Sequence, residues 1–99
     1  MDKKIARLTY NQLELLAFFL KKPEAVLTVA EMEQATALKQ KTLGGVLSSL
    51  SRTKFRDNSL IQPMGRAKNG VGLRWVLNKD IIDVYRAQLE VKRLLASYK

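Results

Sequence analysis

The sequence contains no cysteine and no histidine in its 99 residues. The first absence excludes thiol catalysis and disulfide bonds, and the second excludes histidine-based general acid–base chemistry. Together they exclude zinc sites built from these side chains. The serines at 48, 49 and 51 therefore have no histidine to activate them, and no glycine-rich loop opens a helix to bind a phosphate. We expect a protein that is not an enzyme and that has no metal or cofactor.

Long hydrophobic runs are also missing. The longest, Leu15–Leu20, is far shorter than the about 20 residues that a membrane-spanning helix needs. Polar residues at positions 10, 11, 12 and 14 interrupt the segment that would form the apolar part of a signal peptide. We expect a soluble, unprocessed, cytoplasmic protein with a single core, and in so small a domain no pocket for a small-molecule substrate or effector.

Positive charge is concentrated in the middle of the chain. The net charge is +9, of which residues 38–79 contribute +8, because nine Lys or Arg stand there against one Asp. Residues 1–37 sum to zero and residues 80–99 to +1. Concentrating one sign of charge costs self-repulsion, which a polyanionic partner relieves. Nucleic acid is the first candidate partner and an anionic membrane surface the second.

Two capping boxes predict the first two helices. Thr9 with Gln12, and Thr28 with Glu31, have the spacing at which side chain and backbone cap each other. Apolar residues recur at helical spacing after Thr9, and Pro23 ends that helix. The helix after Thr28 is short.

A third helix is predicted over residues 39–53. Its buried face is an apolar stripe of Leu43, Val46, Leu47 and Leu50. Lys39 stands at the capping position, for which lysine is poorly suited. Gly44 and Gly45 inside the helix together cost about 2 kcal/mol relative to alanine. Either they bring the helix backbone close to a phosphate or another helix, or they mean that this turn reads few bases, and the sequence leaves both readings open.

A basic hairpin follows the third helix. The two predicted strands are Ser59–Met64 and Val71–Leu77, joined by a turn at Asn69-Gly70. Pro63 confines the first strand to an edge or a strand end.

The last predicted helix is capped by Asn78 or Asp80 and runs to about Tyr98. It has more apolar residues than packing on one side requires, so we expect it to pack or to form a homodimer. The residues assigned to the dimer contact are Ile81, Val84, Tyr85, Val91, Leu94, Leu95 and Tyr98.

The order helix, short helix, tight turn, helix, basic hairpin, helix resembles the winged helix-turn-helix superfamily. Leu27–Met32 is similar to the opening of that superfamily's second helix, and Leu38–Leu50 to its recognition helix. Ser59–Pro63, Gly65-Arg66 and Arg74–Leu77 resemble its wing. The resemblance implies a mainly α fold with a small β-hairpin: a three-helix core plus wing over residues 1–79, and an additional C-terminal helix over residues 80–99.

The resemblance also implies a function: a small DNA-binding transcriptional regulator. The helix at 39–53 would enter the major groove of double-stranded DNA, and the wing at 65–70 would contact the adjacent backbone or minor groove. The implied DNA-binding residues are Lys39, Gln40, Lys41, Thr42, Gly45, Arg52, Lys54, Arg56, Arg66, Lys68 and Asn69. The alternative is a winged-helix protein–protein module within a larger assembly. A membrane-surface role is disfavoured because the basic residues do not follow one amphipathic helix.

Overall fold

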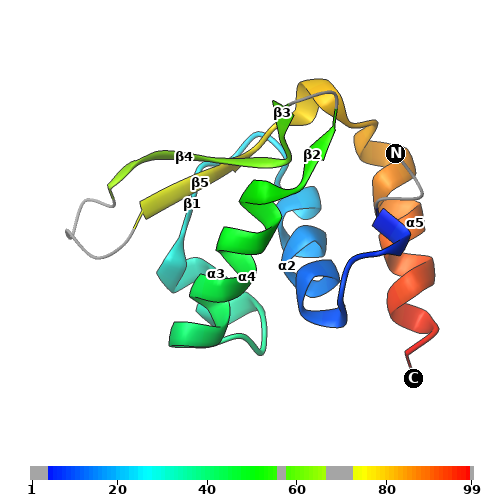
Figure 1. Cartoon of the computed structure of the whole chain (residues 1–99), viewed down its shortest axis with the longest axis horizontal. Coiled ribbons are helices and arrows are strands. Elements are labelled where there is room, and N and C mark those ends of the chain that lie inside the picture. The colour runs from blue at the N-terminus through cyan, green and yellow to red at the C-terminus, as the bar shows by residue number, and fades with distance from the viewer. Residues whose placement is uncertain (1–4, 56–57, 67–72, 99) are drawn as a thin grey trace.

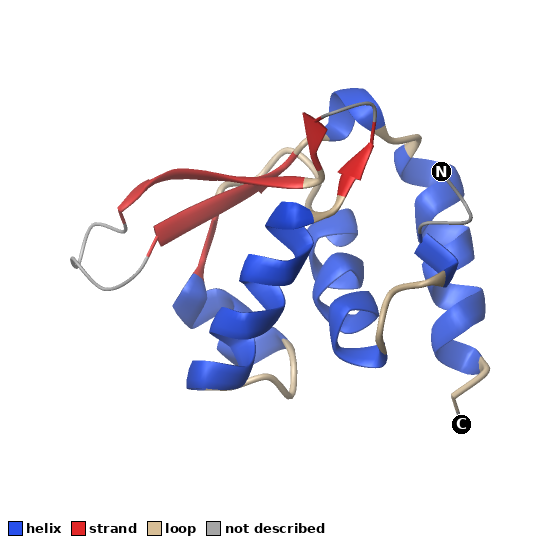
Figure 2. Ribbon diagram, in the orientation of Figure 1, coloured by secondary structure: helices blue, strands red, loops and turns tan. Residues whose placement is uncertain are grey.

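The computed structural model describes residues 5–55, 58–66 and 73–98. The described chain is mainly helical with a small three-stranded antiparallel sheet, so the coarse fold class is confirmed (Figures 1 and 2). The elements are α2 (Tyr10–Lys21), β1 (Leu27–Thr28), α3 (Val29–Ala35), α4 (Gln40–Arg52), β2 (Lys54–Phe55), β3 (Asn58–Ser59), β4 (Ile61–Arg66), β5 (Leu73–Leu77), the 3-10 helix η1 (Lys79–Ile81) and α5 (Val84–Ala96).

Both predicted capping boxes are confirmed. The backbone N–H of Gln12 donates to Thr9 Oγ1 at 3.3 Å, and the Thr9 N–H donates to Gln12 Oε1 at 2.8 Å. Thr28 and Glu31 make the same reciprocal pair at 3.2 and 3.1 Å. These bonds satisfy amide groups that have no partner inside the helix, and they fix where α2 and α3 begin. The first helix ends at Lys21, before Pro23.

The sheet has one strand more than the predicted hairpin. Its order is β1-β5-β4, all antiparallel, with Leu27 opposite Trp75 and Ile61 opposite Leu77. β1 has only two residues, too few to show the alternation by which a strand is recognised in a sequence. β4 lies at the edge of the sheet, where Pro63 is tolerated because that position needs no N–H donor.

The first predicted strand is divided in two. Asn58–Ser59 pairs with Lys54–Phe55 in a separate two-stranded sheet, and β4 begins only at Ile61. The Leu60 N–H donates to the Thr53 carbonyl at 3.0 Å, which holds the segment between the two sheets against the end of α4. The predicted turn at 69–70 and the strand residues at 71 and 72 lie outside the described residues.

The last helix begins later than predicted. Neither Asn78 nor Asp80 caps it, because a 3-10 turn and the extended residue Ile82 come first. Asp83 is the cap, and its Oδ1 accepts the Arg86 N–H at 3.1 Å. The break lets Ile82 enter the core before α5 starts.

The core surrounds α2, which lies between α4 and α5 (Figure 1). Five of its twelve residues are buried, on more than one side of the helix: Leu13, Leu15, Leu16, Phe19 and Leu20. The β4–β5 hairpin extends away from the helices (Figure 2). In the described ranges, no helix combines the length and the apolar character needed to cross a membrane.

Candidate nucleic-acid interface

α4 separates an apolar face from a basic and polar one. The predicted stripe of Leu43, Val46, Leu47 and Leu50 is buried, which confirms it as the face toward the core. The residues on the opposite side are exposed: Lys41, Thr42, Gly44, Gly45, Ser48 and Arg52. No Asp or Glu occurs within α4, β4 or β5. The outer face of α4 therefore carries positive charge without a compensating acid on the same elements.

Lys39 does not lie on this face as a free cation. It occupies the N-cap position in extended conformation and makes no side-chain capping bond, as expected for lysine. Its Nζ donates instead to the carbonyl oxygen of Glu33 in the last turn of α3. A cation at that helix end satisfies a free carbonyl and opposes the negative end of the helix dipole. Lys39 thus joins α3 to α4, and the DNA contact that the resemblance implies for it stays a prediction. The side chain of Gln40 lies outside the described part of the chain.

The position of α4 is set partly by a polar contact that the sequence did not reveal. Gln12 Nε2 on α2 donates to Ser49 Oγ on α4 at 2.8 Å, and the Ser49 hydroxyl donates to the Val46 carbonyl at 3.0 Å. The two residues are 37 positions apart, so no local pattern could have shown the pair.

The hairpin is braced by Arg74, which was also missed. Its Nη2 donates to the Met64 carbonyl at 3.1 Å and lies 3.6 Å from where a Cβ on Gly65 would be. Gly65 has φ of +81°, at the irregularity in β4 between Pro63 and Arg66. Arg66 ends β4 and is exposed, while Lys68 and Asn69 lie outside the described residues.

The other Lys and Arg residues of the basic segment 38–79 differ in whether an acidic side chain neutralises their charge. Lys79 Nζ lies 2.6 Å from Glu24 Oε1; this hydrogen-bonded ion pair lowers the pKa of the Glu24 carboxyl and raises the pKa of Lys79. Lys54 is exposed in β2, and Arg56 lies outside the described residues. Lys41, Arg52 and Arg66 are exposed and form no hydrogen bond or ion pair with the rest of the described chain.

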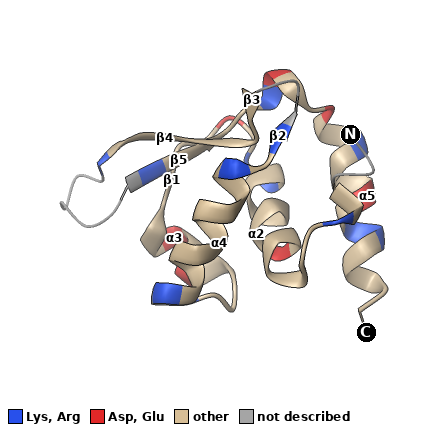
Figure 3. Ribbon diagram, in the orientation of Figure 1, with Lys and Arg blue, Asp and Glu red and all other residues tan. Residues whose placement is uncertain are grey.

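These cations belong to α4 and to the β4–β5 hairpin. Figure 3 shows Lys and Arg at both ends of α4 and along the outer part of the β4–β5 hairpin. Lys41 and Arg52 are eleven residues apart, which is about 16 Å along an α-helix and about five base pairs of duplex. Among the described residues, no three His, Cys, Asp or Glu side chains gather into a metal site. The exposed face of α4 therefore presents positive charge, hydroxyl groups and, at its two glycines, accessible helix backbone.

The residues predicted for a dimer contact do not all reach the surface. Val91 is 2% exposed and lies in the chain's own core, so it has no surface to offer a second copy. The partly buried residues pack against that core: Ile81, Val84, Leu94 and Leu95. Tyr85 and Tyr98 are exposed, as is Leu89, which the prediction omitted. The Tyr98 ring meets Tyr10 edge-on with centroids 5.2 Å apart.

Gly44 and Gly45 have no packing role within the described chain. A Cβ built on either glycine meets no atom within 4 Å. Gly45→Ala is therefore expected to stabilise the fold by about 1 kcal/mol through helix propensity alone. Urea unfolding should show a higher midpoint with an unchanged slope. A lower urea midpoint would contradict this prediction, because it would mean that the added methyl group collides with another part of the chain.

Comparisons with protein-family models, with curated proteins and with solved structures found no match for this chain. The candidate interface therefore rests on the structure of this chain alone, and it consists of the exposed face of α4 and the β4–β5 hairpin.

Proposed function

We propose that this chain is a small DNA-binding protein of the winged helix-turn-helix type, acting as a transcriptional regulator. α4 lies in the major groove, and the β4–β5 hairpin contacts the adjacent backbone or minor groove. The carrying observation is the exposed face of α4, where Lys41 and Arg52 have no acidic partner among residues 5–55, 58–66 and 73–98, together with exposed Arg66 at the end of β4. An α-helix fits the roughly 12 Å width of the major groove.

The chemistry of this face favours contacts to phosphates over the reading of bases. Gly44 and Gly45 expose helix backbone with open space above it, so a phosphate or groove wall can approach closely. Only Thr42 and Ser48 add short polar side chains among the described residues of this face. Lys41, in the first turn of α4, is the residue placed to reach a base edge or a phosphate. Affinity is then largely electrostatic.

Fluorescence anisotropy with labelled duplexes of unrelated sequence tests the proposal. The titrations cover about 50 to 200 mM salt, a range over which counterion release dominates the affinity. We expect log K to fall linearly with log salt, with a slope of about −0.9 for each phosphate neutralised. Absence of binding at the low-salt end would reject DNA as the partner.

A second candidate function is a protein–protein module within a larger assembly. The observation that favours it is again the pair Gly44 and Gly45, because open, small positions on an exposed helix allow a second helix to pack closely. Under this alternative the chain binds no duplex at low salt.

We also propose that the protein is a homodimer through the outer face of α5. Tyr85 is 69% exposed and Leu89 is 53% exposed, and the two residues are one helical turn apart. Large apolar side chains grouped at adjacent turns of a helix are typical of association surfaces.

A further inference from the structure

A groove lies between α2 and α5. It holds about 490 Å³, within the range of about 300–1,000 Å³ typical of small-molecule sites. Leu20 and Val91, both part of the hydrophobic core, form part of its lining, together with Ala17 and Leu95. An apolar group seated there would extend the core.

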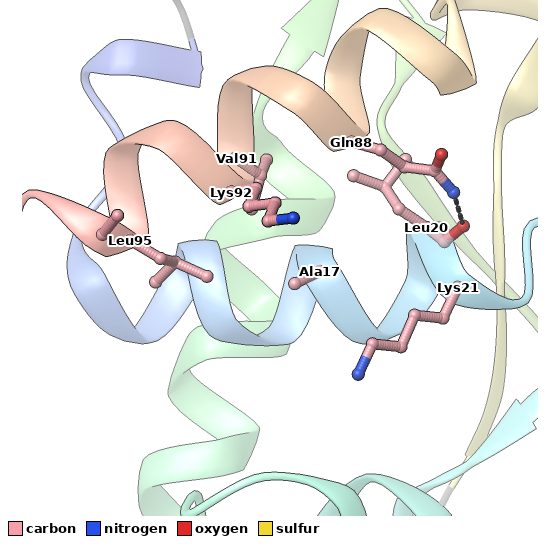
Figure 4. Close-up of a pocket in the computed structure, with 8 residues that line it drawn as sticks. Ala17, Leu20, Lys21, Gln88, Val91, Lys92 and Leu95 are labelled. Carbon is pink, nitrogen blue, oxygen red and sulfur yellow. Dashed lines mark hydrogen bonds between the residues drawn. The ribbon is translucent and has the colours of Figure 1, made fainter.

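The small side chain of Ala17 is what keeps the groove open. α2 forms one side of the groove and α5 forms the other, with Gln88 toward one end and Leu95 toward the other end (Figure 4). Gln88 Nε2 donates to the Leu20 carbonyl at 2.7 Å, which bridges the two helices at that end. Because this bond satisfies the carbonyl at the end of α2, the groove is left with a mainly apolar wall.

Two cations and no acid line the groove. In Figure 4 the Lys92 side chain extends from α5 over the groove toward Ala17, while Lys21 lies on the other side of the α2 ribbon. Neither ammonium group has a hydrogen-bond or ion-pair partner in the described chain. Lys21 also borders an adjoining hollow that contains Glu14, so Lys92 is the less compensated of the two.

We propose that this groove binds an aliphatic monocarboxylate. The hydrocarbon tail lies against Ala17 and Leu95, which are only partly buried, above the core side chains Leu20 and Val91, and the carboxylate pairs with Lys92. A second copy of α5 is a poorer occupant, because it would bring its own Lys92 toward the same cation. The site lies at α5, whereas the proposed DNA interface is the exposed face of α4 and the hairpin, so the inference does not rest on the proposed function.

An NMR titration of the ¹⁵N-labelled full chain with sodium decanoate, kept below its micelle concentration, tests the proposal without DNA. We expect saturable shifts at the amides of Ala17, Gln88 and Leu95. Decyltrimethylammonium has the same tail with the opposite charge, and it should bind about two- to thirtyfold more weakly, since it loses an ion pair and gains a repulsion.

Variants separate the tail contact from the charge contact. Ala17→Phe fills the groove and should abolish saturable binding, whereas Ala30→Phe, at an exposed position of α3, should leave it unchanged. Lys92→Gln should weaken binding about 1.5- to fivefold, the range for one exposed ion pair, and Lys21→Gln should weaken it less. Thermal unfolding of each variant shows that it is folded.

Several results would overturn the inference. Shifts scattered over the surface without saturation, or equal affinity for the cationic amphiphile, would show nonspecific adsorption. Unchanged binding in Ala17→Phe would place the ligand elsewhere. A dimer that Ala17→Phe dissociates without any ligand would assign the groove to a second copy.

Discussion

Replacing Lys41 and Arg66 together by glutamate is expected to weaken duplex binding about a hundredfold or more. Each charge-assisted hydrogen bond to a phosphate contributes about 1.5 kcal/mol or more, so losing two lowers the affinity by about two factors of ten. The slope of log K against log salt should become shallower by about 2, because two fewer counterions are released. Anisotropy titrations of parent and variant at several salt concentrations measure both quantities.

A matched control separates local contact from overall charge. Arg7→Glu with Lys22→Glu makes the same change in net charge at exposed cations outside α4 and the hairpin. This double variant should retain most of the affinity, because neither residue belongs to the proposed contact elements and salt screens charges that do not touch the DNA. If both double variants bind like the parent, Lys41 and Arg66 do not face DNA. If both double variants lose affinity equally, the loss is caused by the change in net charge, and the exposed face of α4 with the hairpin is not the DNA-binding surface.

Leu50→Ala is expected to destabilise the fold by about 2–5 kcal/mol, a large part of the about 5–15 kcal/mol that holds a domain of this size together. Leu50 is fully buried near the end of α4, and its loss leaves a cavity beneath the proposed interface. Urea unfolding followed by circular dichroism measures the change. A loss below about 1 kcal/mol would show that α4 is not anchored to the core at this residue.

Leu89→Ala is the matched control, since it makes the same chemical change at a residue that is 53% exposed. In the monomer it should cost less than about 0.5 kcal/mol. In a dimer formed through α5, the cost should grow with protein concentration, because association stabilises the folded state by mass action. Light scattering should then show a larger molar mass for the parent than for the variant. A monomeric parent at all concentrations would reject the homodimer.

Much of the secondary structure was predictable because its signals are local. The hydrogen bonds of Thr9 to Gln12 and of Thr28 to Glu31 join residues three positions apart. A segment of four residues is therefore enough to predict where each helix begins. The stripe from Leu43 to Leu50 likewise determines which side of α4 is buried. The late start of α5 was missed because Asn78, Asp80 and Asp83 are all plausible caps, and the burial of Ile82 selects among them.

The candidate interface depended on contacts that no local pattern contains. The sequence determined the amount of positive charge and its position in the middle of the chain, but every Lys and Arg there contributes equally to that sum. Tertiary structure decided that Lys39 bonds to Glu33 and that Lys79 pairs with Glu24. It also left Lys41, Arg52 and Arg66 without an acidic partner in the part of the chain that the structure describes.

The same division holds for the helix packing. The sequence by itself determined where α2 and α4 lie along the chain, because helix periodicity and capping act over three or four residues. Only the tertiary structure decided that Val91 is buried while Tyr85 is exposed, and that Ala17 leaves a groove beside Lys92. Which side of an apolar helix is covered depends on the surface that packs against it, and that surface comes from residues distant in the chain.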